Sequence, residues 1–245
     1  MRTILLTFGL IFLVRVGFGQ TMRSLKELVS VPDSGWVALQ REVAAAKNKV
    51  EVLPRDSGVA GEALYHTQVT TRSLMGAIVY RTGGILIDGG WIRILGSASE
   101  RLPRSLPDWN KGKTFQDFGD KPAFYLVGDD AIGGFFALNG GGLGKDVGAV
   151  YYLAPDNLKW ASLWESYGAW VDFCVAGDLV KFYGDYRWKG WRKDLDTLGG
   201  GRIFYIIPPL WSKEGKDINR DWHRAVSADE LYSHTMLMRR KVGVD

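Results

Sequence analysis

The chain has 245 residues, of which 46% are hydrophobic and 24% charged, which excludes an intrinsically disordered protein and fits an ordinary folded globular one. Ten Trp, ten Tyr and eleven Phe residues provide apolar area for a sizeable core. The single cysteine, Cys174, excludes an intramolecular disulfide. Because Cys174 lies in an apolar helical stretch, we expect a small buried hydrophobic residue rather than a nucleophile.

The first twenty residues, MRTILLTFGLIFLVRVGFGQ, have the pattern of a secretory signal peptide. An apolar run at residues 4–14 follows a basic residue and is too short to span a bilayer comfortably. Gly17 and Gly19 resemble the small residues before a cleavage site. We predict removal of residues 1–19, an exported protein of the periplasm or extracellular space, and no stable membrane insertion after cleavage. Arg15, close to the cut, leaves an uncleaved membrane anchor as the alternative.

Cleavage removes two arginines and no acidic residue, so the net charge falls from +4 to +2. This near-neutral balance gives no support for a nucleic-acid partner. The aromatic and basic stretch at residues 182–193, FYGDYRWKGWRK, resembles a stacking surface for bases or sugars. We favour a different interpretation, in which Trp188 and Trp191 belong to the core and the basic side chains lie outside, namely Arg187, Lys189, Arg192 and Lys193.

Residues 22–84 are predicted to be mainly helical. Trp36, Leu39 and Val43 have helical spacing in SGWVALQREVAAAKNK, and Ser34 is a suitable N-cap. GEALYHTQ and SLMGAIVYRTGG indicate two further helices, the second ended by its glycines.

Residues 85–155 are predicted to form a sheet. ILIDGGWIRILG has the pattern of a hairpin around two glycines, and AFYLVGDD, GGFFALN and AVYYLAPD add three strands with short connections. The natural arrangement is an antiparallel meander sheet of about five to six strands flanked by helices.

Residues 156–211 are predicted to contain helices and a last strand. Trp160, Leu163 and Trp164 lie at helical spacing with residues further along the chain. RIFYIIPPLW is a strand stopped by two prolines. A capping-box pattern predicts a C-terminal helix at residues 227–241. Residues 22–245 would then form a single α+β domain.

The stretch GDDAIGGFFALNGGG, residues 128–142, suggests a phosphate loop or a catalytic acid pair. A P-loop is excluded because Asn139 replaces its first glycine and Asp146 replaces the hydroxyl residue after Lys145. The dinucleotide pattern fails because Val147 stands where the third glycine is needed. We therefore predict no cofactor.

Asp129 and Asp130 are adjacent at a strand end, so their side chains point to opposite faces and do not converge on one atom. Three histidines, His66, His223 and His234, show no ligand spacing. We predict no metal site and no catalytic residue; the acidic pair stabilises a β-hairpin turn in which glycines take positive φ. On the strand after this turn, Phe135 and Phe136 also point to opposite faces, one into the core and the other under a helix or a partner. The candidate binding surface comprises Trp91, Asp129, Asp130, Phe135, Trp188 and Trp191.

Several motifs together resemble an uncharacterised bacterial family, domain of unknown function 2625. They are TRSLMGAIVYRTGGILIDGGWIRILGS, LPRSLPDWN, GDDAIGGFFALNGGGLG, VYYLAPD, GDLVKFY and PPLW, within residues 22–240. This resemblance implies no known activity and no catalytic residue.

The order of these motifs is also distantly similar to the SUKH superfamily, in which the hairpin at residues 128–138 and the strand at residues 150–153 would be scaffold. That resemblance implies an α+β fold with a curved sheet and a protein-binding role, in many members toxin immunity; export would move such a role to the periplasm.

The favoured function is a non-enzymatic, exported, immunity-like module that binds another protein. The alternative is an envelope carbohydrate-binding protein or hydrolase with a platform of Trp91, Trp109, Trp188 or Trp191. The identity of the partner and the oligomeric state stay open.

Overall fold

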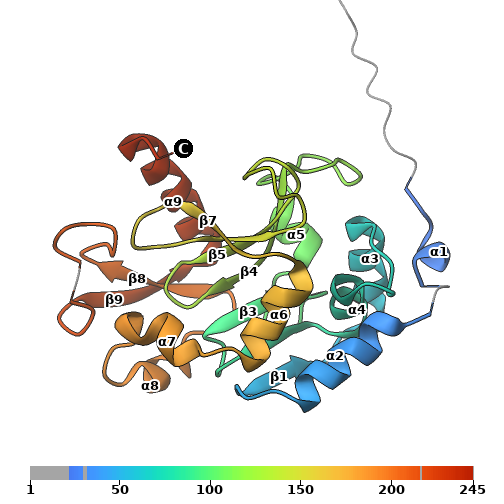
Figure 1. Cartoon of the computed structure of the whole chain (residues 1–245), viewed down its shortest axis with the longest axis horizontal. Helices are drawn as coiled ribbons and strands as arrows, with labels where there is room; N and C mark the ends of the chain where they lie inside the picture. The colour runs from blue at the N-terminus through green and yellow to red at the C-terminus, as the bar shows by residue number, and fades with distance from the viewer. Residues whose placement is uncertain (1–21, 30–31, 216, 245) are drawn as a thin grey trace, which may run out of the picture.

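A seven-stranded antiparallel sheet forms the centre of the computed structural model, which describes residues 22–29, 32–215 and 217–244 (Figure 1). Each strand pairs with the next one along the chain, which confirms the predicted meander but gives a larger sheet than five to six strands. The predicted signal peptide lies outside the described residues. The strands are β1 (Val50–Leu53), β2 (Gly84–Ile87), β3 (Ile92–Leu95), β4 (Phe124–Asp130), β5 (Phe135–Asn139), β6 (Val150–Leu153) and β7 (Trp160–Trp164).

The two edge strands of this sheet correct the sequence prediction. β1 lies inside the segment that we expected to be helical, and its short Val-Glu-Val-Leu alternation pairs along its whole length with β2. β7 occupies residues that we assigned to a helix. The spacing of Trp160 and Trp164 fits either a helix or a strand, and the segment is a strand because it pairs with β6. The helix begins only at Tyr167, after Ser166 accepts a hydrogen bond from the Ala169 amide.

The predicted helices before the sheet are present. Asp56 and Ser73 cap two of them by accepting backbone N–H groups. Helices α2, α4 and α6 contact one another, and α2 and α4 lie side by side on the right of Figure 1. The helices are α1 (Leu25–Val29), α2 (Ser34–Ala44), α3 (Ser57–Thr67), α4 (Leu74–Arg81), α5 (Leu106–Asn110), α6 (Tyr167–Ala176), α7 (Leu179–Tyr183), α8 (Trp191–Leu195) and α9 (Ala228–Val242), with a 3₁₀ turn at Gly184–Tyr186.

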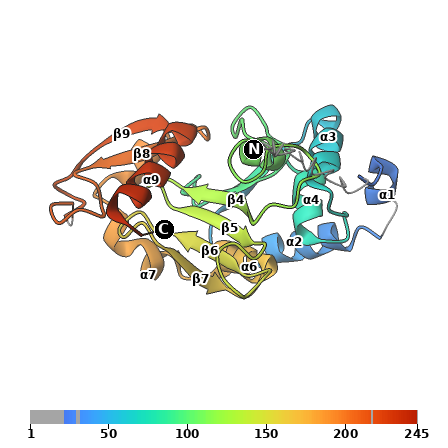
Figure 2. The same cartoon turned by 90° about the horizontal axis from the view of Figure 1, so that it is seen from above.

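A separate two-stranded sheet stands beside the main one. β8 (Arg202–Ile207) is the predicted last strand, but it pairs with β9 (Trp222–Ser227), which we did not predict, and not with the main sheet. Helix α9 follows β9 directly, with Ser227 accepting the Asp229 amide as its N-cap. In Figure 2 the pair and α9 form one group on the left.

The hairpin between β4 and β5 matches the prediction for residues 128–142. The turn follows Asp130, and Gly133 takes a φ of +89°. Phe135 lies edge-to-face with Tyr232 of α9 at 5.1 Å between ring centroids, whereas Phe136 lies 5.1 Å from Trp170 of α6. Both phenylalanines are fully buried, so this hairpin is covered by helices on both faces.

Candidate functional site

Asp129, at the end of β4, is the centre of a buried ion-pair network. Arg93 on β3 donates to its Oδ1 atom at 2.5 Å, and Arg104 donates to its Oδ2 atom. The same guanidinium groups reach the carbonyls of Arg202 at 2.6 Å and Gly200 at 2.8 Å. Burial alone would raise the pKa of Asp129, but Arg104 and Arg93 outweigh it and lower the pKa. This carboxylate therefore joins the main sheet to the start of β8.

Asp130 points the other way, as expected for its neighbour in a strand. Its Oδ1 atom accepts the amides of Ile132 and Gly134, and its Oδ2 atom accepts the hydroxyls of Tyr152 and Tyr183, at 2.7–3.1 Å. Burial raises its pKa, more than these hydrogen bonds lower it. The fold therefore fills two acceptor positions on each oxygen of Asp130.

Trp91, Trp188 and Trp191 pack into one buried cluster, with ring centroids 4.9 Å apart for Trp91 and Trp191. Arg187 stacks over Trp191 at 4.3 Å and pairs with Asp88 at 2.7 Å. Its side chain is only 7% exposed, so the expectation that it lies outside is wrong.

The six residues of the candidate binding surface do not form a surface. Each is buried, at 7% exposure or less, because helices α6 to α9 and the second sheet pack over them. The platform of four tryptophans is excluded for the same reason, since Trp109 is also buried. Cys174 is buried as predicted, and burial raises the pKa of its thiol well above the usual value.

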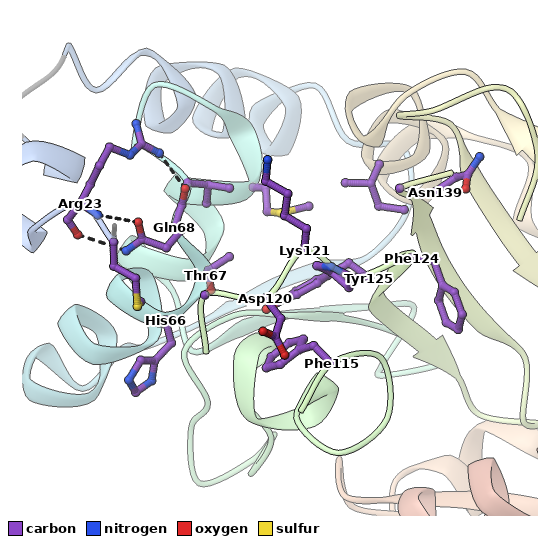
Figure 3. A pocket seen from close by; sticks show the side chains of 17 residues that line it. Arg23, His66, Thr67, Gln68, Phe115, Asp120, Lys121, Phe124, Tyr125 and Asn139 are labelled. Carbon is purple, nitrogen blue, oxygen red and sulfur yellow. Dashed lines mark hydrogen bonds between the residues drawn. The ribbon is translucent and has the colours of Figure 1, made fainter. Parts of the chain in front are cut away.

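A pocket of about 650 Å³ lies elsewhere, at the end of the sheet where β4 begins and β5 ends (Figure 3). This volume is in the range of ligand sites. The pocket combines an apolar lining with a few polar side chains. The apolar lining comprises Met22, Val69, Met75, Phe115, Pro122, Phe124, Tyr125 and Leu138.

Hydrogen bonds fix one wall of this pocket. The amide of Arg23 donates to Gln68 Oε1 at 2.8 Å, and the Arg23 guanidinium donates to the Gln68 carbonyl at 2.7 Å. Gln68 Nε2 donates back to the Arg23 carbonyl. Gln68 caps α3 in the left-handed conformation, with φ at 57°. The segment before α1 is therefore held against the end of α3.

The opposite wall is a loop built around Asn139. Its amide group donates to the carbonyls of Gly144 and Asp146, and its oxygen accepts the amides of Gly141 and Leu143. The Asn-Gly-Gly-Gly run that suggested a phosphate loop thus shapes a pocket wall by binding its own backbone.

Two polar groups in the pocket lie close to its apolar lining. The Tyr125 hydroxyl is buried beside the Thr67 hydroxyl, which donates to the carbonyl of Ala63. Burial raises the pKa of Tyr125, so its hydroxyl stays a neutral donor. Lys121 makes no ion pair within the described residues, and its side chain reaches between the wall with Gln68 and the wall with Asn139 (Figure 3).

The remaining polar side chains offer no nucleophile with a neighbouring base. His66 stacks flat on Phe118, with ring centroids 3.7 Å apart. Asp120 accepts the amides of Gln116 and Asp117. Within the described ranges, no group of three or more His, Cys, Asp and Glu side chains is arranged to hold a metal ion.

An unpaired strand edge borders the pocket at Phe124. β3 pairs with β4 only from Gly128 onward, and Asn110 satisfies the backbone of Leu126 through two hydrogen bonds, at 2.7 and 2.8 Å. Backbone groups two residues apart face the same side of a strand, so those of Phe124 face away from β5 as well. In the described part of the chain no strand pairs with Phe124 on that side.

Sequence reasoning missed this pocket because its lining comes from separate segments around residues 22, 68, 75, 120 and 139. The only local signal was the glycine run after Asn139. This run suggested a phosphate loop, but it forms a wall of the pocket.

The family described as "Protein of unknown function DUF2625" matches residues 25–231. A protein of Haemophilus influenzae titled "Uncharacterized protein" is 42% identical over 209 residues, which cover 85% of this chain and 87% of that protein. "Putative uncharacterized protein YbfG" of Escherichia coli is 40% identical over 218 residues, 89% of this chain and 98% of that protein. The chain therefore belongs to the DUF2625 family, as its motifs indicated.

Proposed function

We propose that this member of the DUF2625 family is a non-enzymatic binding module that holds an extended segment of a partner protein in the pocket at the start of β4. The observation that carries the proposal is the combination of an aromatic lining, a buried Tyr125 hydroxyl beside Thr67, and a Lys121 cation that makes no ion pair within the described residues.

The chemistry of these groups defines the segment. The aromatic and aliphatic lining favours apolar side chains, which lose water on binding. The Tyr125 hydroxyl, which lies beside that of Thr67, would donate to a carbonyl or carboxylate of the segment. Lys121 would attract an acidic side chain or a chain terminus.

The strand edge at Phe124 favours a polypeptide over a compact small molecule. An extended segment could continue the sheet there through main-chain hydrogen bonds, a common mode of peptide recognition. The SUKH resemblance of the motif order supports a protein-binding role independently.

Export is part of the proposal and is supported by the N-terminal pattern in residues 1–19. The helices of the described ranges are all too short or too polar to cross a bilayer. Sequencing the N-terminus of protein isolated from separated cell fractions tests this, and Gln20 as the first residue of periplasmic or secreted protein is expected. A retained Met1 in the membrane fraction would instead support the anchor.

The binding test is capture of a partner from the native host by the tagged mature protein, followed by mass spectrometry. Capture is compared with two pocket variants, Leu138→Arg, which fills the cavity, and Lys121→Glu, which reverses its charge. Lys181→Glu on α7 is the matched control because Lys181 does not line the pocket.

One protein that is captured by wild type and by Lys181→Glu, and lost from both pocket variants, is the expected result. Equal capture by all four folded proteins would overturn the assignment of the pocket. A small molecule found in the pocket by native mass spectrometry, with no dependent protein, would overturn the peptide as its ligand.

A further inference from the structure

Methionine side chains form part of the apolar lining of the pocket at the start of β4. Of the four methionines in the described ranges, Met22 and Met75 line the pocket, whereas Met236 and Met238 lie on α9. Met75 is buried, with 7% of its surface exposed, and Met22 is only partly buried. Solvent therefore reaches the Met22 thioether more readily than that of Met75.

Hydrogen bonds of the next residue hold Met22 at the edge of the pocket. Arg23 exchanges three hydrogen bonds with Gln68 at the end of α3 (Figure 3). On the other side, a Cβ atom at position 119 would lie 3.5 Å from the Cγ and Sδ atoms of Met22, so the thioether packs close to the Gly119 backbone. The Met22 side chain therefore joins the wall with Gln68 to the loop before β4.

Thioethers are the groups of this apolar lining that a peroxide oxidises under mild conditions. One oxygen atom passes from hydrogen peroxide to the sulfur: the O–O bond breaks, an S=O bond forms, the sulfur loses two electrons, and the peroxide leaves as water. The product, methionine sulfoxide, is polar and accepts hydrogen bonds, whereas the thioether packs as an apolar group.

A sulfoxide at Met22 would oppose the binding of an apolar segment. A ligand that packs on the lining removes water from Met22, and a polar group that is buried without a hydrogen-bond partner is unfavourable. The amide group of Gln68 cannot supply that partner freely, because its Nε2 atom already donates to the carbonyls of Arg23 and Tyr65.

We propose that Met22 is an oxidation site whose sulfoxide weakens binding in the pocket, an inference that rests on the binding role proposed above. The reduced thioether admits an apolar segment, and oxygen transfer from a peroxide lowers the affinity. Export of the chain, as its N-terminal pattern predicts, would place this site outside the reducing cytosol.

The test uses the mature protein and an anilinonaphthalene sulfonate dye, whose rings suit the apolar lining and whose sulfonate suits Lys121. Leu138→Trp fills the cavity without adding charge, so loss of dye binding in this variant assigns the dye to the pocket. Brief treatment with hydrogen peroxide should oxidise Met22 before Met75 in peptide maps and weaken dye binding about tenfold. Methionine sulfoxide reductases with a dithiol should restore the affinity, because they return the thioether and release water.

Two variants separate Met22 from the other methionines. Met22→Leu removes the sulfur and keeps an apolar side chain, so peroxide should leave its dye affinity unchanged. Met238→Leu is the matched control on α9, and it should lose affinity on treatment as wild type does.

Four results would overturn the proposal: oxidation of Met22 no faster than that of Met75, complete oxidation of Met22 without loss of dye affinity, equal losses in Met22→Leu and wild type, or dye binding that Leu138→Trp leaves unchanged. Dye binding in the pocket that depends on oxidation, with no partner protein captured, would instead overturn the proposed function alone.

Discussion

Asp129→Asn is the substitution that most directly tests the buried network beneath the β4–β5 hairpin. Asp129 balances two guanidinium groups, those of Arg93, which is 1% exposed, and Arg104, which is 10% exposed. An amide would keep the acceptor for Arg93 but turn a donor toward Arg104. For charges about 4 Å apart at an effective dielectric near 20, each lost attraction is about 4 kcal/mol before solvent relaxes. Breaking buried pairs of this kind typically costs about 3–5 kcal/mol.

Asp130→Asn is the matched control, one residue away and equally buried. Its oxygen can still accept the amides of Ile132 and Gly134, and its NH₂ group can donate to the hydroxyls of Tyr152 and Tyr183 once these rotate. Because burial already raises the pKa of Asp130 toward the neutral form, we expect a loss below about 1.5 kcal/mol. Urea unfolding followed by tryptophan fluorescence measures both free energies. Equal losses in the two variants would refute the assignment of the charge balance to Asp129.

Three further outcomes follow from the same region. Gly134→Ala should lower the free energy of unfolding by about 1–3 kcal/mol, because its Cβ would lie 2.3 Å from Asp130 Oδ2 and from the Tyr152 hydroxyl. Gly184→Ala is the control, because open space surrounds Gly184, and it should stay within about 1 kcal/mol of wild type. Similar losses in the two variants would count against close packing at Gly134. The pKa of Asp129 is lowered in the folded state, so its contribution to the free energy of unfolding is present above 3.8, the pKa in the unfolded chain, and is lost as pH falls below it. The free energy of unfolding should therefore fall more steeply with decreasing pH for wild type than for Asp129→Asn, and parallel curves would contradict this. The Cys174 thiol, buried and with a raised pKa, should react with a thiol reagent only at the rate of opening or unfolding, whereas immediate reaction in native buffer would contradict its burial.

Local patterns in the sequence identified much of the fold. The hairpins around Gly89 and Gly133 and the C-terminal helix capped by Ser227 follow from residues close in the chain, and each was predicted with its physical reason. The predicted N-cap Ser34 is instead the first residue of α2, after Asp33. β1 and β7 were not predicted because four- or five-residue strands carry little periodicity, and their identity depends on the neighbours they pair with. Trp160 and Trp164 illustrate this, since the same spacing fits one face of a helix.

The candidate surface failed for a different reason. Aromatic and charged residues such as Trp191, Arg187 and Asp129 look functional one at a time, but the fold brings them into contact with one another and buries them. The pocket was not predictable because Arg23, Gln68, Lys121 and Asn139 meet only through tertiary structure. The burial of the Tyr125 hydroxyl also depends on tertiary contacts, which no sequence pattern records.

Photo-crosslinking in the native host tests the central claim most directly. A photoreactive phenylalanine derivative placed at position 138, inside the pocket, is compared with the same group at position 180, which is 72% exposed on α7 and outside the pocket. We expect position 138 to crosslink one extended segment of one partner protein, identified by mass spectrometry, and position 180 to give no such product. The same products from both positions, or none from position 138 in folded protein, would contradict a peptide-binding pocket at the start of β4.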